Sequence, residues 1–266
     1  MATDTRELES ITVERTDGVV TITLRRPEKK NAADAAMWNE LLDEFRAIAS
    51  NQADRAVVLT GAGGNFCSGA DLWQGGSGDG PPPHQLSAMR HISDVCLALH
   101  RIPQPTVAKV RGVAVGAGLN MALSCDLVVA SDNARFSEIF AKRGLSLDFG
   151  GSWLLPRLVG MHRAKELALL AEIIDAQQAA EMGLVNRVLP DDEVDEFVDD
   201  WATRLAGGPP VALAMSKRLL NNSMHVTLEE ALDDEGLSQT VNFGTTDTVE
   251  AIKAFMEKRD PVFEGR

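Results

Sequence analysis

The sequence has few cysteines, and the three it has are far apart. They are Cys67, Cys96 and Cys125. An odd, unclustered set of this kind argues against a disulfide framework and against a zinc site or other metal centre. We therefore expect a protein of a reducing compartment, the cytoplasm, in which these thiols are packing residues.

The sequence also lacks long apolar runs. No window of the 266 residues approaches 18 consecutive apolar side chains, so a transmembrane helix is not expected. The first ten residues are polar and include Asp4, Glu7 and Glu9, which leaves no apolar core for a signal peptide. The length suits one large domain, or a domain with an appendage, and predicts no membrane partner.

Positive charge is in deficit. The chain has 26 Lys and Arg against 39 Asp and Glu, a formal net charge of −13. Nucleic-acid binding requires clustered cations, so this balance argues against a nucleic-acid partner. An anionic ligand would need a local basic patch. The densest such cluster contains Arg25, Arg26, Lys29 and Lys30.

The first half of the chain alternates strand and helix patterns, and the second half has helical patterns only. A hairpin is predicted around Asp17-Gly18, between strands at 11–15 and 19–24. After about residue 152 we expect helices alone, so the chain is predicted to be an α/β protein with a helical C-terminal region. The other predicted strands are 56–60, 106–110 and 127–130, the helices 34–50, 84–100 and 119–124, and the capping pairs 175/178, 227/230 and 247/250.

Residues 75–83, GGSGDGPPP, are the only low-complexity stretch. Because strand and helix patterns resume beyond it, we interpret it as a mobile surface loop and not as a linker between domains. The chain has no internal repeat.

Two glycine-containing loops follow predicted strands, at 65–72 and 112–118. Glycine lets backbone N–H groups turn toward a ligand, and two such loops together could direct two donors at one oxygen atom, as in an oxyanion hole. Ordinary turns are the alternative interpretation. Neither loop is a phosphate-binding fingerprint, because the third glycine and a Gly-Lys-Ser/Thr motif are both missing.

Six ordered motifs then point to a known family. The chain resembles the enoyl-CoA hydratase/isomerase (crotonase) family over essentially its full length. The resemblance implies an α/β, crotonase-type β-β-α spiral core at 1–200, which contains the active site, and a C-terminal helical region at 201–266 for trimerisation. A homotrimer or a dimer of trimers is therefore expected. The motifs lie at 26–32, 66–72, 112–126, 157–160, 179–186 and 254–259.

The resemblance also implies the chemistry. The partner would be an acyl-CoA thioester, whose oxygen lies between two backbone N–H groups and takes the charge of an enolate. By motif position these donors belong to Ala70 and Ala117. No separate cofactor is implied, because coenzyme A is part of the substrate.

Hydratases of the family use two glutamates, and the matching positions here are Asn120 and Phe140. Neither side chain transfers protons under ordinary conditions, so a two-carboxylate hydration is in doubt. Glu138 lies two residues from the second position and would share a face with Phe140 only in an extended segment. We interpret Asn120, Phe140 and Glu138 as candidates for orienting the substrate.

Asp148 is the remaining candidate for proton transfer. The resemblance is strongest here to members that isomerise acyl-CoAs with an aspartate at this position, including a ring-epoxide isomerase. Apolar sequence neighbours such as Phe149 and Trp153 predict a raised pKa for Asp148. The alternative is that Asp148 caps a helix. A dehalogenase would also need a histidine on the preceding helix, and His91 is displaced by about two residues.

Coenzyme A carries phosphates, and the resemblance implies contacts with it in two segments of the chain. A solvated charged face is the alternative for each of the cations. The candidate contact residues are Arg25, Arg26, Lys29, Lys30, Ala32, Ser68, Asp71, Leu72, Phe255 and Lys258.

Together these observations predict an acyl-CoA enzyme that isomerises an enoyl-CoA or a ring-epoxide acyl-CoA, with Asp148 as the only proton shuttle. An enoyl-CoA hydratase is the alternative within enzymes. A non-catalytic acyl-CoA-binding protein is the alternative of another class.

Overall fold

The structure is a computed structural model that describes residues 3–71 and 84–266. The predicted hairpin is confirmed, since the second and third strands are antiparallel and joined by Asp17 and Gly18, with φ angles of +52° and +82°. Two successive positive φ angles match the twist of the flanking strands, which explains the Asp-Gly pair. The first three strands form a meander and are β1 (Asp4–Glu7), β2 (Ile11–Thr16) and β3 (Val19–Leu24).

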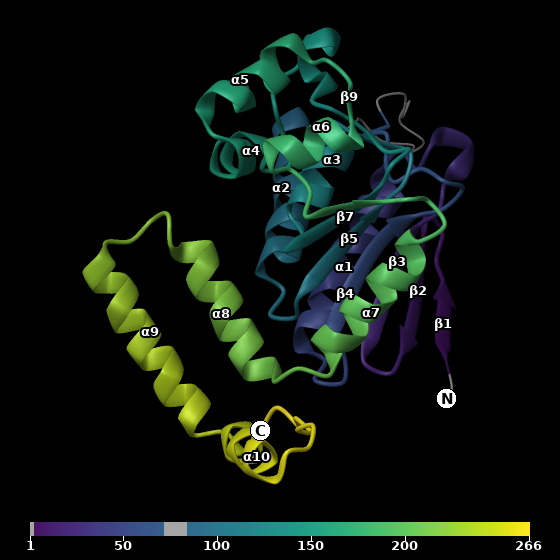
Figure 1. Cartoon of the computed structure of the whole chain (residues 1–266). Coiled ribbons are helices and arrows are strands. Elements are labelled where there is room, and N and C mark those ends of the chain that lie inside the picture. The colour runs from purple at the N-terminus through teal and green to yellow at the C-terminus, as the bar shows by residue number, and fades with distance from the viewer. Residues whose placement is uncertain (1–2, 72–83) are drawn as a thin grey trace.

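Four further strands extend this meander into a seven-stranded sheet in the order β1-β2-β3-β4-β5-β7-β10 (Figure 1). They are β4 (Ala56–Gly61), β5 (Thr106–Val110), β7 (Leu127–Ser131) and β10 (Arg187–Leu189). From β3 onward neighbouring strands are parallel, which requires crossover connections. The helices in the first three crossovers are α1 (Ala35–Ser50), α2 (Gln85–Arg101) and α3 (Ala117–Leu123).

These elements confirm the sequence predictions closely. The strands predicted at 56–60, 106–110 and 127–130 are present, two of them one residue longer. The first helix has Asp34 as its N-cap, which accepts a hydrogen bond from the Met37 backbone N–H at 2.8 Å. The helix predicted at 119–124 begins two residues earlier, at Ala117. The predicted loop at 75–83 lies outside the described residues.

Helices cover both faces of the large sheet. On one face, Val58, Val107 and Val129 pack against α7 (Val194–Ala206). On the other face, Val57, Leu59 and their neighbours belong to a larger core that includes α1, α2 and α3. Because successive strand residues point to opposite faces, the apolar runs of β4 and β5 supply both layers.

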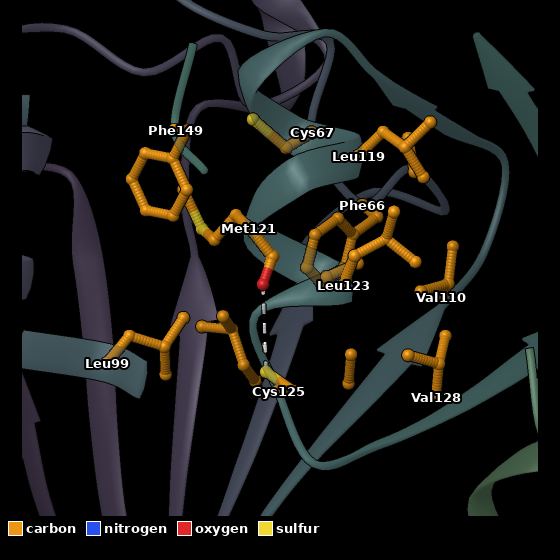
Figure 2. Close-up of a cluster of buried hydrophobic side chains, with 14 of the residues drawn as sticks. Phe66, Cys67, Leu99, Val110, Leu119, Met121, Leu123, Cys125, Val128 and Phe149 are labelled. Carbon is orange, nitrogen blue, oxygen red and sulfur yellow. Dashed lines mark hydrogen bonds between the residues drawn. The ribbon is translucent and has the colours of Figure 1, made fainter. Parts of the chain in front are cut away.

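Helix α3 runs through the larger core, and all seven of its residues are buried. Figure 2 shows Leu119, Met121 and Leu123 of this helix among Phe66, Phe149 and other apolar side chains. A second sheet lies beside α3, in the order β6-β8-β9. Its strands are β6 (Val113–Val115), β8 (Arg135–Ser137) and β9 (Ile174–Asp175).

The prediction of helices alone after residue 152 is wrong, because β9 and β10 follow α5. These strands are only two and three residues long, too short for an alternating pattern to stand out from the helices around them. The helices before and between them are α4 (Gly151–Val159), α5 (Met161–Leu170) and α6 (Ala176–Met182).

Two of the three predicted capping pairs are confirmed as capping boxes, Asp175 with Gln178 and Thr227 with Glu230. The third prediction is wrong. Asp247 lies inside the last helix and accepts hydrogen bonds from the backbone N–H groups of Glu264 and Gly265. Its partner in the prediction, Glu250, instead pairs with Arg259. The spacing matched that of a capping pair. However, the C-terminal segment folds back onto α10, and both carboxylates bind groups of that segment.

The last three helices stand away from the sheet, and α8 and α9 run side by side (Figure 1). The boundary predicted after residue 200 falls within α7, and the chain leaves the sheet only after residue 206. None of the helices in the described residues combines the length and apolar character needed to span a membrane. The three helices are α8 (Pro210–Asn222), α9 (Leu228–Phe243) and α10 (Thr246–Glu257).

Gly118→Ala should destabilise the fold, because a Cβ at Gly118 would lie 2.4 Å from the Cys67 carbonyl oxygen, a backbone atom that cannot move alone. We expect the free energy of unfolding to fall by about 3 kcal/mol in urea titrations. Gly236→Ala is the matched control. A Cβ at Gly236, inside α9, meets nothing within 4 Å, so alanine should stabilise by about 0.5–1 kcal/mol. Equal effects of the two substitutions would contradict this packing.

Candidate active site

The two predicted glycine loops lie against each other. The Cys67 backbone N–H donates to the Val113 carbonyl, and the Val115 N–H donates to the Cys67 carbonyl, both at 2.9 Å. This pairing continues β6 with the segment before Gly69. A Cβ at Gly69 would lie 3.0 Å from the Val115 carbonyl oxygen and 3.9 Å from the Ala117 nitrogen, so glycine permits the approach. The structure therefore brings the loops together.

In the part of the chain that the structure describes, the backbone N–H groups of Ala70 and Ala117 are not used in the contacts between the two loops. Ala70 lies in an isolated bridge with Ala33, but the bonds of that bridge use the neighbouring Gly69 carbonyl and Asp71 N–H. Ala117 is the first residue of α3, whose N–H has no intrahelical acceptor. Within the described residues, neither N–H has a backbone acceptor. Two free donors on adjoining loops are what an oxyanion hole requires.

Asn120 lies one turn into α3 and is completely buried. Its Nδ2 donates to the Asp148 carbonyl oxygen at 3.0 Å and to Glu138 Oε2 at 3.4 Å. A Cβ at Gly151 would lie 2.5 Å from Nδ2, so this glycine makes the room that the amide occupies. Asn120 thus links three segments that are distant in sequence.

Glu138 and Phe140 flank the start of the 3-10 helix η2 (Ile139–Arg143), and both are buried. Phe140 packs against the second glycine loop, where its ring would lie 3.5 Å from a Cβ on Gly116. Glu138 instead contacts Asn120. The pKa of Glu138 is raised from 4.5 to about 8, mainly by burial; the Asn120 hydrogen bond lowers this pKa and the charge of Asp148 raises it.

Asp148 precedes α4 and is half-buried. Burial raises its pKa from 3.8 to about 6, in the direction that its apolar sequence neighbours predict. The capping alternative is wrong. Gly150 is the N-cap of α4, and it is the Asp148 carbonyl, not the carboxylate, that accepts from the Gly151 N–H at 2.9 Å. Among the described residues, Asp148 Oδ1 has no hydrogen-bond partner.

Phe149 fixes the backbone beside Asp148, and sequence reasoning missed this role. Its φ is +44°, an uncommon value for a residue with a Cβ. The ring compensates by packing in the core (Figure 2), 5.5 Å from the Trp38 ring. Anchored backbone strain of this kind is common at functional sites. The Gly150-Gly151 pair that follows Phe149 was the feature of the sequence that could have indicated this unusual backbone.

The cysteines act as packing residues in this core. Burial raises the pKa of the Cys67 thiol to about 11 and that of Cys125 to about 12. A thiol with so high a pKa is not a nucleophile at neutral pH. The Cys96 pKa is also raised, by burial.

The cation cluster beside the first loop is largely engaged within the protein. Arg26 forms ion pairs with Asp34 and Asp71 at 3.1 Å, and Lys29 reaches Asp71 at 2.8 Å. Arg25 pairs with Glu7 at 3.3 Å. Ser68 Oγ donates to the Lys29 carbonyl, and Arg26 donates to that of Ala32.

The other predicted coenzyme A contacts lie elsewhere. Phe255 is 85% exposed on α10, and Lys258 follows that helix as its left-handed C-cap. In Figure 1, α10 lies at the opposite end of the molecule from the first glycine loop, which follows β4 and leads into the grey trace. Leu72 lies outside the described residues. A single chain therefore does not bring the two predicted contact segments together.

A cavity of about 730 Å³ lies between α2, α4 and α8. Its wall includes Cys96, Gly150 and Trp153, but not Asp148. Trp153 stacks on His225 of the α8–α9 turn and donates to its Nε2 at 3.1 Å. No spacing in the sequence indicated this contact between α4 and the C-terminal helices. His91 lies on α2, and its Nε2 is buried.

Comparison with known proteins identifies the family. A family model described as enoyl-CoA hydratase/isomerase matches residues 14–266. This fold belongs to that class of acyl-CoA enzymes, and the chain is a member of the enoyl-CoA hydratase/isomerase (crotonase) family.

The chain is similar to relatives whose names give different activities. A probable enoyl-CoA hydratase of Rhodobacter capsulatus is 40% identical, over 97% of this chain and 98% of its own length. The 1,2-epoxyphenylacetyl-CoA isomerase of Escherichia coli is 37% identical, over 94% and 96%. The structure of an enoyl-CoA hydratase from Bacillus anthracis superposes with a TM-score of 0.91 at 33% identity, over 97% and 100%. Hydratases and isomerases are therefore both among its relatives.

Proposed function

We propose that this protein isomerises an unsaturated or ring-epoxide acyl-CoA, with Asp148 as the single proton shuttle. The observation that supports this most directly is the state of Asp148, a half-buried carboxylate with a pKa of about 6 and an oxygen that has no partner among the described residues. At pH 7 such a group is mostly ionised and can remove a proton, yet its pKa is high enough to return it efficiently.

In the proposed mechanism, an oxyanion hole stabilises the negative charge that the proton transfer creates. As Asp148 removes a proton next to the thioester, negative charge develops on the carbonyl oxygen. The N–H groups of Ala70 and Ala117 would donate to that oxygen. Donors held in advance by the fold need no reorganisation during the reaction, and each contributes about 2.7–4 kcal/mol in characterised enzymes. Protonation at a second carbon by Asp148 then completes the shift, with no separate cofactor.

Hydration is the second candidate, because a hydratase is among the relatives. It requires a water molecule activated by a carboxylate, whereas the two positions implied for that role hold Asn120 and Phe140. An assay with crotonyl-CoA separates the two activities, since hydration removes the absorbance of the conjugated thioester. A non-catalytic acyl-CoA-binding protein would change no substrate.

We also propose that the protein associates through its C-terminal helices as a trimer or a dimer of trimers. Large apolar side chains on α8–α10 are exposed in the single chain, which is unusual for a surface left in water. Association would bring Phe255 and Lys258 of one subunit near the site of another. These exposed side chains include Leu220, Leu228, Phe243, Phe255 and Met256.

Light scattering in solution should therefore give a mass three or six times that of the 28.7 kDa chain. Exposed apolar surface is the physical reason, so the assembly should persist at high salt. A monomer at micromolar concentration would contradict the proposal.

Asp148→Asn should lower kcat by about 10²–10⁴-fold, because the amide cannot accept the proton. Acyl-CoA affinity should change little, since the donors Ala70 and Ala117 remain. In the unchanged protein kcat/KM should fall as the pH drops below about 6, where Asp148 becomes protonated. Asp175→Asn, at an exposed N-cap where asparagine is equally suitable, is the control. Full turnover in Asp148→Asn would refute the assignment.

Replacing Lys29 and Lys30 with glutamine should raise KM for the acyl-CoA with little change in kcat, because these cations are proposed to face its phosphates far from the reacting carbons. Arg26 is left intact, since it is largely buried in ion pairs with Asp34 and Asp71 and its loss would destabilise the fold. Steady-state kinetics at low ionic strength measure the effect. An unchanged KM would place coenzyme A elsewhere.

A further inference from the structure

Glu138 is a fully buried carboxyl group, and no cation among the described residues acts on it. In the described residues, the groups that act on it are Asn120, through a hydrogen bond, and Asp148, through its negative charge. The charged side chains of η2, Lys142 and Arg143, are exposed. Those of α5, which packs against η2, are exposed as well: His162, Arg163, Lys165 and Glu166. Within residues 3–71 and 84–266, no positive charge is therefore placed to compensate an ionised Glu138.

The oxygen atoms of Glu138 are also poorly solvated. Oε2 accepts one hydrogen bond, from Asn120 at 3.4 Å, and among the described residues Oε1 has no partner. An ionised carboxylate normally accepts several hydrogen bonds, and burying it without them is far less favourable than burying the neutral acid. The geometry thus favours the protonated form of this side chain.

Asn120 connects Glu138 to the proposed proton shuttle. Its Nδ2 group donates to Glu138 and to the backbone carbonyl of Asp148, so both amide protons have acceptors. The missing side chain at Gly151 leaves the amide a close-fitting space. A change at Glu138 would therefore alter how the Asn120 amide is held, and with it the backbone of residue 148.

We propose that Glu138 is a positioning residue that works as a neutral carboxylic acid, holding Asp148 through Asn120 while adding no second negative charge beside it. This inference rests on the proposed role of Asp148. It deepens that role because it explains how one of two neighbouring carboxyl groups remains the only anion. Burial separates their pKa values, about 6 for Asp148 and about 8 for Glu138, so near pH 7 the two are in opposite protonation states.

The proposal assigns the fall in activity at high pH, the alkaline limb of the pH profile, to the ionisation of Glu138. Once Glu138 ionises, its charge opposes both ionised Asp148 and the enolate, and kcat should fall above about pH 8. Glu138→Gln mimics the neutral acid, because its amide oxygen can still accept from Asn120. This variant should keep most of its activity at pH 7 and lose the alkaline limb.

Glu138→Leu is the matched variant without an acceptor. It leaves an Asn120 proton unsatisfied, and kcat should fall by about 10-fold at every pH. Both variants are to be measured from pH 5 to 10 with a 3-enoyl-CoA as substrate. Melting temperatures show whether each variant is folded.

The dependence of the melting temperature on pH is a second measurement that tests the proposal with Glu138→Gln. Because burial raises the pKa of Glu138 above its unfolded value, the native protein loses stability as the pH rises from about 4.5 through about 8, whereas the glutamine variant does not. The variant should therefore melt above the unchanged protein at pH 9, and the two should melt similarly at pH 5.

Two results would overturn the inference. If folded Glu138→Gln is inactive at pH 7, an ionised Glu138 is required. If its alkaline limb is unchanged, another group produces that limb. Neither result touches the role of Asp148, which Asp148→Asn tests separately.

Discussion

The contact between the Cys67 carbonyl and α3 is the constraint on which the rest of the site depends. That carbonyl accepts from the Val115 N–H and lies where a side chain on Gly118 would be. The approach joins a loop after β4 to a loop after β6, and along the chain α2, β5 and β6 lie between these loops. Without it, the loops that carry Ala70 and Ala117, the proposed donors, would not lie against each other.

Three polar residues of the candidate site differ in how deeply they are buried. Asn120 and Glu138 are wholly enclosed, and Asp148 is partly open. Desolvation is the main cause of both raised pKa values, and the more deeply buried carboxyl has the greater shift. A fold that used two ionised carboxylates here would need a cation or more donors. Within the described residues it has one amide, which donates to Glu138 and to the backbone carbonyl of Asp148, and this arrangement favours a neutral Glu138.

Local patterns predicted the elements that position the site. Asp17-Gly18 indicated its hairpin, Asp34 its helix start, and the two glycine-containing segments a pair of adjoining loops. Contacts between distant segments could not be predicted this way. The dense cluster with Arg26 looked like a free anion site, but Asp34 and Asp71 engage that arginine from other segments.

The residues of the candidate site show the same contrast between features that sequence neighbours predict and features that depend on distant segments. The apolar neighbours of Asp148 correctly indicated the direction of its pKa shift. The left-handed backbone of Phe149 depends on the core that holds its ring, including Trp38, over a hundred residues away. The link from Glu138 to Asn120 required the turn at η2 to be known, and the sequence left an extended or a helical segment equally open.

Exchange of the acyl-CoA α-proton with solvent tests the central claim most directly, because every catalytic interpretation of this site passes through a thioester enolate. The protein would be incubated with a 3-enoyl-CoA in deuterated water and α-deuterium followed by mass spectrometry, alongside Asp148→Asn. We predict rapid incorporation by the unchanged protein and nearly none by the variant. No incorporation by the unchanged protein, or equal incorporation by both, would contradict an enolate formed by Asp148.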